Sequence, residues 1–180
     1  MTYNVIQGDA TNPIGNGIKV IPHVCNDKGS WGAGFVMSLS RKWAEPEKKY
    51  REWHKAYALA VPGSKSDEQL FGAKFALGGV QFVTVAGAES DATIVANMIG
   101  QHKTGYDETG RPPIRYVALA DAMFLVQQFV NDKISKGYPT SIHCPMFGSA
   151  LAGGHWGAIE AMILELWVDK GIDVTVYKYG

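Results

Sequence analysis

The stretch "HVCNDKGSWGAGF", from His23 to Phe35, decides how this sequence is interpreted. The apolar run "IKVIPHV" leads into it and predicts a strand, and "FVMSLSRKW" continues from it with the pattern of a helix. The residues between the two are small or flexible except for one tryptophan: Gly29, Ser30, Trp31, Gly32 and Gly34. Glycine allows a backbone to come close to another group, so the loop raises the question of what lies against it.

A second stretch, "SIHCPMFGSALAGGHW", repeats this plan of apolar strand, His-Cys pair, glycine-rich loop and helix. Both loops are expected at the carboxyl ends of parallel strands, the edge where open α/β sheets bind ligands. Backbone N–H groups and a helix N-terminus favour phosphate there, and two loops suit a diphosphate better than a single phosphate. Neither loop fits the G-x-G-x-x-G or G-K-[ST] motif. From the residues alone, a ligand site and plain tight turns remain equal alternatives.

The remaining segments predict strands that alternate with helices. Strands are expected at 3–9, 18–25, 75–87, 92–101, 140–147 and 173–179, and helices at 35–43, 46–59, 116–134 and 155–171. One helical stripe is predicted to pack in the core: Leu119, Met123, Val126, Val130 and Ile134. The fold class is therefore α/β, with a mainly parallel sheet that carries helices on both sides.

Composition limits the classes of function. The chain has 180 residues, 46% of them hydrophobic, which suits one domain over residues 1–180. Seventeen basic and seventeen acidic residues cancel, which argues against general nucleic-acid binding. No apolar run is long enough for a membrane span, and the start "MTYNVIQGDATNP" does not resemble a signal peptide. With two cysteines only, Cys25 and Cys144, a reducing cytoplasm is expected, and the composition is compatible with a monomer.

Four motifs in the same order resemble the macrodomain family, the ADP-ribose-binding fold, over nearly the whole chain. They are "VIQGDATNP", "HVCNDKGSWGAGF", "CPMFGSALAGGHW" and the closing "DVTVYKY". The resemblance implies a three-layer α/β/α fold with a mixed, mostly parallel central sheet. The form H-x-C-N-x-x-G-S-W-G-x-G is most similar to the branch that includes the yeast-type ADP-ribose-1''-phosphate phosphatase. The branch that removes ADP-ribose from acidic side chains is the next most similar.

The resemblance also implies the ligand contacts. Asp9 would accept a hydrogen bond from the adenine amino group, and Asn26 would bind the distal ribose through its amide. The glycines would be present because a diphosphate and a ribose lie against the backbone. Trp31 would cover the distal end of the ligand, or pack on its own helix. The ligand-binding residues expected are Gly8, Asp9, Ala10, Asn26, Gly29, Ser30, Trp31, Gly32, Ala33, Gly34, Gln101, Phe147, Gly148, Ser149, Ala150, Leu151 and Ala152.

The candidate catalytic residues are His23, Asn26 and Asp27. His23 would protonate the leaving sugar oxygen or orient a water, because an unperturbed imidazole titrates near neutrality. A strand histidine bonded to the backbone is the plain alternative, and His143 is a weaker candidate. Ala152 stands where the acidic-side-chain branch places an Asp, which argues against that mechanism. A zinc site formed by the two His-Cys pairs is disfavoured, because adjacent strand residues point to opposite faces.

The predicted activity is hydrolysis of ADP-ribose-1''-phosphate to ADP-ribose and phosphate, without a metal or an organic cofactor. A reader that holds ADP-ribose without turnover is the alternative from another class. Removal of ADP-ribose from proteins or nucleic acid is the third. The expected partners are therefore ADP-ribose, its 1''-phosphate or ADP-ribosylated macromolecules, with no membrane partner.

Overall fold

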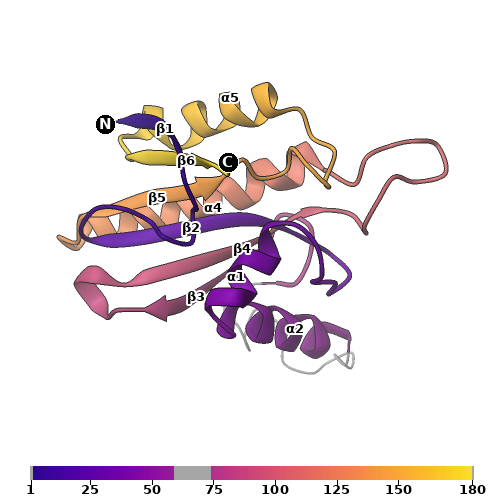
Figure 1. Ribbon diagram of the computed structural model, residues 1–180, viewed down its shortest axis with the longest axis horizontal. Helices are drawn as coiled ribbons and strands as arrows, with labels where there is room; N and C mark the ends of the chain where they lie inside the picture. Colours follow the sequence, from indigo (N-terminus) through magenta and orange to yellow (C-terminus); the bar gives the residue numbers. More distant parts are fainter. Residues whose placement is uncertain (1, 59–73, 180) are drawn as a thin grey trace.

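Six strands form one sheet between two layers of helices in this computed structural model, which describes residues 2–58 and 74–179. In chain order, the elements are β1 Tyr3–Gln7, β2 Ile18–Asn26, α1 Phe35–Lys42, α2 Glu45–Ala58, β3 Val80–Ala86, β4 Thr93–Gln101, α4 Tyr116–Ser135, β5 Thr140–Pro145, α5 Trp156–Leu166 and β6 Val174–Lys178. The predicted three-layer α/β/α class is therefore confirmed (Figure 1).

The strand order is β1-β6-β5-β2-β4-β3, and every neighbouring pair is parallel except β3 with β4. The sheet is thus mixed and mostly parallel, as expected. From β2 the chain runs to β3 and β4 on one side of it, and α4 then carries the chain back to β5 on the other side. This reversal places the carboxyl ends of β2, β4 and β5 at a topological switch point, where ligands bind in open α/β sheets.

Residues of the strands alternate between two hydrophobic cores, one on each face of the sheet. Val20 of β2 and Met98 of β4 pack with α4 and α5, whereas Ile21 and Ile99 pack with α1 and α2. Val20, Met98, Ile21 and Ile99 are all fully buried. A strand that faces a helical layer on both sides must be apolar at almost every position, which explains the continuous apolar runs in the sequence.

Strands β2 and β5 pair for only three residues and then separate. Their register runs from Ile18 with Thr140 to Val20 with Ile142. Ile18 donates its N–H to the Pro139 carbonyl at 2.9 Å, which shows that the even-numbered residues of β2 face β5. The next donors of this parallel ladder would be Pro22 and Pro145, and proline has no N–H. The ladder therefore ends there, and the two strands diverge toward their carboxyl ends.

Two elements and one core residue differ most from the prediction. Strand β3 begins at Val80 rather than at residue 75, because Phe75 packs with the core beneath α1 and α2. Helix α5 ends at Leu166, and a short 3-10 turn at Val168–Lys170 leads to Gly171 in the left-handed conformation. Ile134, predicted in the core stripe of α4, is instead 42% exposed, because it lies in the last turn of the helix.

Residue 59, the end of the second predicted helix, lies outside the described residues. None of the helices in the described part of the chain is long and apolar enough to cross a membrane.

Candidate functional site

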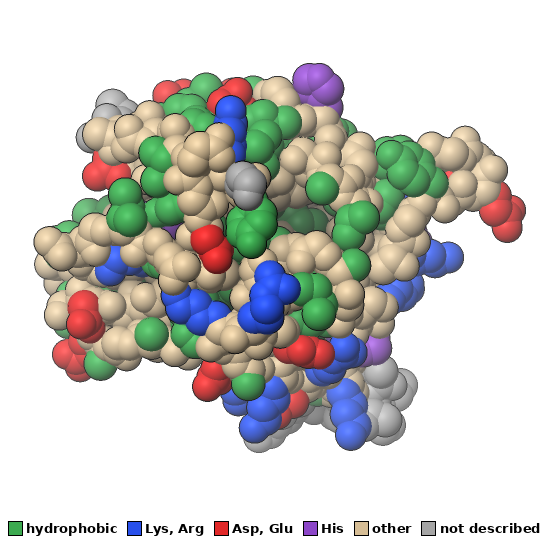
Figure 2. Space-filling view, in the orientation of Figure 1, with side chains coloured by type: hydrophobic (Ala, Val, Ile, Leu, Met, Phe, Trp, Pro, Cys, Tyr) green, Lys and Arg blue, Asp and Glu red, His purple; other side chains and the backbone are tan. Residues whose placement is uncertain are grey.

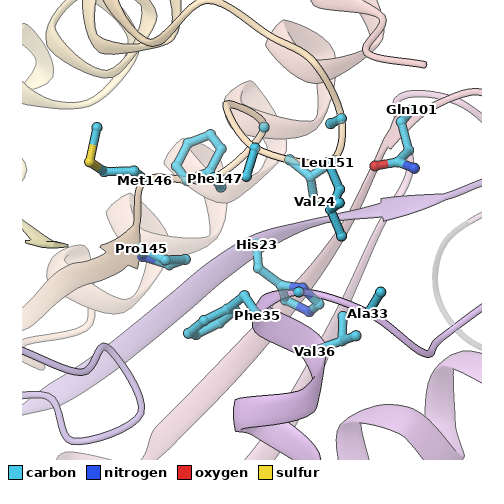
Figure 3. A pocket seen from close by; sticks show the side chains of 14 residues that line it. His23, Val24, Ala33, Phe35, Val36, Gln101, Pro145, Met146, Phe147 and Leu151 are labelled. Carbon is cyan, nitrogen blue, oxygen red and sulfur yellow. The ribbon is translucent and has the colours of Figure 1, made fainter. Parts of the chain in front are cut away.

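A cleft opens where β2 and β5 separate, between the loop that follows β2 and the loop that follows β5. It consists of two adjoining cavities of about 120 and 420 Å³, which share Val24, Ala33, Val36, Gln101 and Leu151. His23 extends from β2 toward Phe35 and Val36 at the start of α1, and Phe147 and Leu151 lie across the opening (Figure 3). The two sequence motifs therefore form opposite walls of one cleft, as their shared plan predicts.

Most of the predicted site residues line this cleft. They are His23, Asn26, Ser30, Trp31, Gly32, Ala33, Gly34, Gln101, Phe147, Gly148, Ala150, Leu151 and Ala152. Six others do not line the two cavities: Gly8, Asp9, Ala10, Asp27, Gly29 and Ser149. For all nineteen predicted site residues, contact with a ligand stays a prediction.

Sequence reasoning missed part of the lining, in particular Pro145, Met146, Thr104 and Gly105. The sequence does contain a signal for Pro145. Proline inside a central strand is unusual, so Pro22 in "IKVIPHV" and Pro145 in "IHCPMF" mark the point where pairing stops. Thr104 and Gly105 follow β4, whose carboxyl end lies at the same edge of the sheet.

The cleft walls carry backbone N–H groups that have no acceptor in the described protein. In the loop after β5, Gly148, Ala150, Leu151 and Ala152 donate no hydrogen bond. On the facing wall, the same holds for Gly32, Ala33 and Gly34 and for Phe35 and Val36 at the start of α1. Unpaired N–H groups at a helix start and in a tight loop together attract an anion. This arrangement suits a phosphate or diphosphate in the cleft.

The Asn26 side chain organises the loop that leaves β2. Its Nδ2 donates to the Ser30 carbonyl at 2.7 Å, and its Oδ1 accepts from the Lys28 and Ser30 N–H groups at 2.9 and 3.1 Å. The Tyr50 hydroxyl lies 3.0 Å from the same Oδ1. The amide oxygen is therefore fully used within the protein. Only the second Nδ2 hydrogen remains for the predicted contact with a ribose.

Trp31 packs on its own helix, which is the second of the two alternatives for this residue. Its Nε1 donates to Ser40 Oγ of α1 at 2.8 Å, and its ring packs against Tyr50 with centroids 5.4 Å apart. The indole is 6% exposed and still forms part of the wall of the larger cavity. Trp31 thus fixes the loop to α1, and its cover of the distal end of a ligand stays a prediction.

At two of the expected ligand-binding glycines, the protein itself leaves no room for a side chain. A Cβ on Gly29 would lie 2.3 Å from Nδ1 of His54, and a Cβ on Gly148 would lie 3.0 Å from Cδ1 of Ile159. Both have a positive φ of 75°, and the space beside each is filled by the protein itself. At Gly32, in contrast, nothing lies within 4 Å of an added Cβ. Of the glycines expected to bind a ligand, Gly32 therefore leaves open space of the kind that a ligand would need, and Gly105 in the wall of the larger cavity does the same.

The expectation that His23 titrates near neutrality is wrong. Its side chain is 1% exposed, and burial lowers the pKa of His23 to about 4, although the hydrogen bond to Asn97 acts in the opposite direction. The two groups are 2.5 Å apart, from Nε2 to Oδ1. At neutral pH the ring is therefore uncharged, and the second ring nitrogen, Nδ1, has no hydrogen-bond partner. A neutral imidazole can accept a hydrogen bond from water or a hydroxyl but is a poor proton donor.

Asp27 is held away from the cleft. Its Oδ2 lies 2.7 Å from Nδ1 of His102, and its Oδ1 accepts from the Lys103 N–H at 2.9 Å. Partial burial acts to raise the pKa of Asp27, but these two hydrogen bonds outweigh it, so the pKa is lowered. The carboxylate joins the end of β2 to the loop after β4, and both of its oxygens are occupied.

His143 also makes internal bonds with both ring nitrogens. Its Nε2 lies 2.8 Å from Ser141 Oγ, and its Nδ1 lies 2.8 Å from the Tyr177 hydroxyl. That hydroxyl also accepts the Ile14 N–H at 3.1 Å, and the tautomer of His143 sets which of its two ring nitrogens donates. The predicted weaker candidate for catalysis thus connects β5 and β6 to the loop after β1.

The Asp9 side chain forms a turn at the end of β1. Its Oδ1 accepts from both the N–H and the hydroxyl of Thr11 at 2.9 Å. Lys42 of α1 holds the same loop through the Thr11 carbonyl and the Asn12 side chain. The second Asp9 oxygen accepts no bond within the described residues, so it is free to accept an amino group, as the predicted adenine contact requires.

No charged side chain of the described chain lines the two cavities. On the face shown in Figure 2, acidic and basic side chains are interspersed over the surface. Among the described residues, no three His, Cys, Asp or Glu side chains come together as metal ligands. Cys25 and Cys144 belong to the cores on opposite faces of the sheet. An anion in this cleft would therefore be held by backbone N–H groups and uncharged polar side chains.

Solved structures show the family of this chain. A protein of unknown function from Bacteroides thetaiotaomicron is 43% identical, with a TM-score of 0.82, over 99% of this chain and 98% of that one. The macrodomain protein from Streptomyces coelicolor is 38% identical, with a TM-score of 0.76, over 99% of this chain and 100% of that one. The chain belongs to the macrodomain family. No protein-family model matches the sequence.

One curated relative carries an enzymatic name, the ADP-ribose 1''-phosphate phosphatase from Lodderomyces elongisporus. The similarity is 39% identity over 56 residues, which is 29% of this chain. The matched part spans 34% of that phosphatase, so its activity is not carried over by the match alone.

Proposed function

We propose that this chain binds ADP-ribose in the cleft between β2 and β5. The observation that carries the proposal is the set of unpaired N–H groups on both walls, at Gly32–Gly34 and at Gly148 and Ala150–Ala152. Two facing sets of donors fit the two phosphates of a diphosphate. The larger cavity adds the amide, hydroxyl and indole groups of Asn26, Ser30 and Trp31 next to this anion site. Such a mixture suits a sugar.

The family supports the same ligand. The DarTG protein of Thermosipho africanus, which shares this fold with a TM-score of 0.60 at 11% identity, was solved in complex with ADP-ribose. The free oxygen of Asp9, after β1, would then accept a hydrogen bond from the adenine amino group. The ligand would extend from there over β6 and β5 to the cleft. The monomeric state and the cytoplasmic location stay predictions.

The geometry favours a protein that binds ADP-ribose without hydrolysing it. Phosphate-ester hydrolysis needs a group that orients the attacking water and one that supplies a proton to the departing sugar oxygen. The cavities contain no carboxylate, lysine or arginine side chain among the described residues, and Asp27 is bonded elsewhere. Ala152 is 5% exposed, and its carbonyl accepts the Ile114 N–H at 3.0 Å, so this position provides structure rather than an acid.

Hydrolysis of ADP-ribose-1''-phosphate is the second candidate. It is supported by 39% identity over 56 residues to a phosphatase of that name and by His23 in the wall of the smaller cavity. In this reaction, water attacks the phosphorus, the bond from phosphorus to the sugar oxygen breaks, and that oxygen takes up a proton. The neutral His23 ring could orient the water through Nδ1, whereas the proton would have to come from solvent.

Phosphorus NMR of ADP-ribose-1''-phosphate with the purified chain separates these candidates. Perturbed diphosphate signals without release of phosphate support a binding module. Growth of free phosphate, abolished in His23→Ala, establishes the phosphatase instead. Diphosphate signals that stay unchanged at excess protein would refute binding in either form. Removal of ADP-ribose from protein or nucleic acid is tested separately, by incubation of the chain with conjugates made on both.

A further inference from the structure

Two buried amide side chains lie next to His23 on the α1/α2 face of the sheet. Asn97 of β4 is opposite His23 in the register, and Gln81 of β3 is opposite Asn97. All three side chains are buried, with exposed fractions of 1%, 0% and 6% for His23, Asn97 and Gln81. Buried polar groups of this kind must satisfy one another, so the direction of each hydrogen bond can be worked out.

Two backbone carbonyls fix those directions. Gln81 Nε2 donates to the Lys49 carbonyl at 2.9 Å, which leaves Oε1 as the atom that faces Asn97. Asn97 Nδ2 donates to this Oε1 at 3.1 Å and to the Pro46 carbonyl at 3.2 Å. Asn97 Oδ1 must then face His23, and it accepts from Nε2 at 2.5 Å. A carbonyl can only accept, so neither amide can be turned around without placing two acceptors or two donors together.

The neutral His23 ring is therefore held with its proton on Nε2 and a lone pair on Nδ1. Nδ1 is buried and has no partner, although His23 forms part of the wall of the smaller cavity. Buried acceptors without a partner are rare and unfavourable, and a donor from outside the protein would remove this penalty. Phosphate oxygens at neutral pH mainly accept hydrogen bonds, so they do not suit a lone pair. A sugar hydroxyl does suit it, because it can donate.

We propose that His23 Nδ1 accepts a hydrogen bond from a ribose hydroxyl of the bound ligand, and that Asn97 and Gln81 are positioning residues that hold the ring in the required tautomer. The proposal rests on the proposed binding of ADP-ribose. It assigns to His23 a role in selecting a sugar hydroxyl over a phosphate oxygen at this point of the cleft. Asn97 and Gln81 act only through His23, and neither lines the cavities.

Nitrogen-15 NMR of the histidine rings tests the proposal on the unmodified chain. The shifts of the two ring nitrogens distinguish a nitrogen that carries a proton from one that carries a lone pair. We expect the free protein to show His23 protonated on Nε2 and bare on Nδ1 at neutral pH. Saturation with ADP-ribose should move the Nδ1 signal in the direction of a nitrogen that accepts a hydrogen bond, while the Nε2 signal stays in place.

Variants then separate positioning from general stability. Asn97→Leu and Gln81→Leu should introduce the second tautomer and weaken ADP-ribose binding several-fold. Gln127→Leu is the matched control, because Gln127 is a buried amide of α4 that donates to the Leu166 carbonyl on the opposite face of the sheet. It should leave the His23 signals and the affinity unchanged. His23→Phe keeps an aromatic ring and should weaken binding about tenfold, the effect of losing one hydrogen bond.

Each opposing result has a distinct meaning. A proton on Nδ1 in the free protein overturns the assigned tautomer. Binding of ADP-ribose that leaves the Nδ1 signal unmoved, or an unchanged affinity in His23→Phe, overturns the ligand contact but not the proposed function. No binding of ADP-ribose at all overturns the proposed function, and the ligand contact falls with it.

Discussion

Asn26 Nδ2 donates a 2.7 Å hydrogen bond to the carbonyl of Ser30, four residues further along the loop that leaves β2. The Ser30 N–H returns the contact to Asn26 Oδ1 at 3.1 Å. One amide therefore closes the loop from both sides, and the residues that line the larger cavity follow directly from this closed turn. The asparagine expected to bind a ribose is first of all the residue that shapes the wall of the cleft.

Asn26→Ala should lower both stability and affinity. It removes the three hydrogen bonds of the amide to Ser30 and Lys28, for a loss of roughly 2–3 kcal/mol in the free energy of unfolding. Chemical denaturation and calorimetric titration with ADP-ribose measure the two effects. Asn26→Asp is the comparison variant, because it keeps both acceptor bonds and sets an oxygen against the Ser30 carbonyl in place of the donor. Equal stability of Asn26→Ala and the unmodified chain would contradict the structural role.

Gly29→Ala and Gly32→Ala should separate protein packing from ligand contact. At Gly29, the positive φ and the contact with His54 predict a loss of about 1–3 kcal/mol in stability. At Gly32 an added methyl group meets no atom of the described protein, so stability should stay within about 0.5 kcal/mol while ADP-ribose binding weakens. Thermal unfolding and binding of the two variants are compared side by side. A stable Gly29→Ala, or unchanged binding in Gly32→Ala, would refute this division.

Leu151 crosses the mouth of the cleft toward Gly34, where its Cδ1 would lie 3.3 Å from an added Cβ. The side chain is 63% exposed, so Leu151→Ala should change stability by less than about 0.5 kcal/mol. It should also speed the dissociation of ADP-ribose, because the ligand would lose its apolar cover. Stopped-flow dissociation rates measure this effect. Val117→Ala, at an exposed position on α4, is the matched control and should leave the rate unchanged.

Stability should fall as the pH is lowered from 6.5 to 4. Burial lowers the pKa values of His23 and His143 from 6.5 to about 4, so in this window the unfolded chain binds more protons than the folded one. The free energy of unfolding therefore falls as the pH is lowered, by at most roughly 3 kcal/mol for each histidine. Urea denaturation at several pH values measures the slope. His143→Phe should reduce the slope of stability against pH. His155→Gln, which removes an exposed histidine, is the control and should leave this slope unchanged.

Binding of ADP-ribose should depend little on salt. No lysine or arginine of the described chain lines the cleft, so the diphosphate would meet backbone dipoles rather than mobile charges. We expect less than about a twofold change in affinity between roughly 0.05 and 0.5 M sodium chloride, since screening acts mainly on exposed charges. Calorimetric titration at the two concentrations gives the answer. A tenfold loss in high salt would mean that cationic side chains take part.

Local patterns were sufficient to predict the elements and the edge of the sheet that forms the site. The apolar runs around Val20 and Val95 could only be strands buried on both faces, and the glycine-rich loops after β2 and β5 could only lie at the carboxyl ends of parallel strands. These features depend on residues near one another in the chain. For the same reason, the family resemblance could place most of the cleft lining correctly, including Gly148 and Ala152.

Tertiary packing decided what individual residues do. Whether Gly29 serves a ligand or makes room for His54 depends on α2, and the state of His23 depends on Asn97 and Gln81 from two other strands. Asp27 was assigned to catalysis because it follows Asn26, yet the loop after β4 occupies both of its oxygens. The sequence by itself thus determined the strands, helices and loops of this protein. Only the folded chain decided which polar atoms remain unpaired for a ligand, because pKa values and hydrogen-bond partners arise from contacts between distant segments.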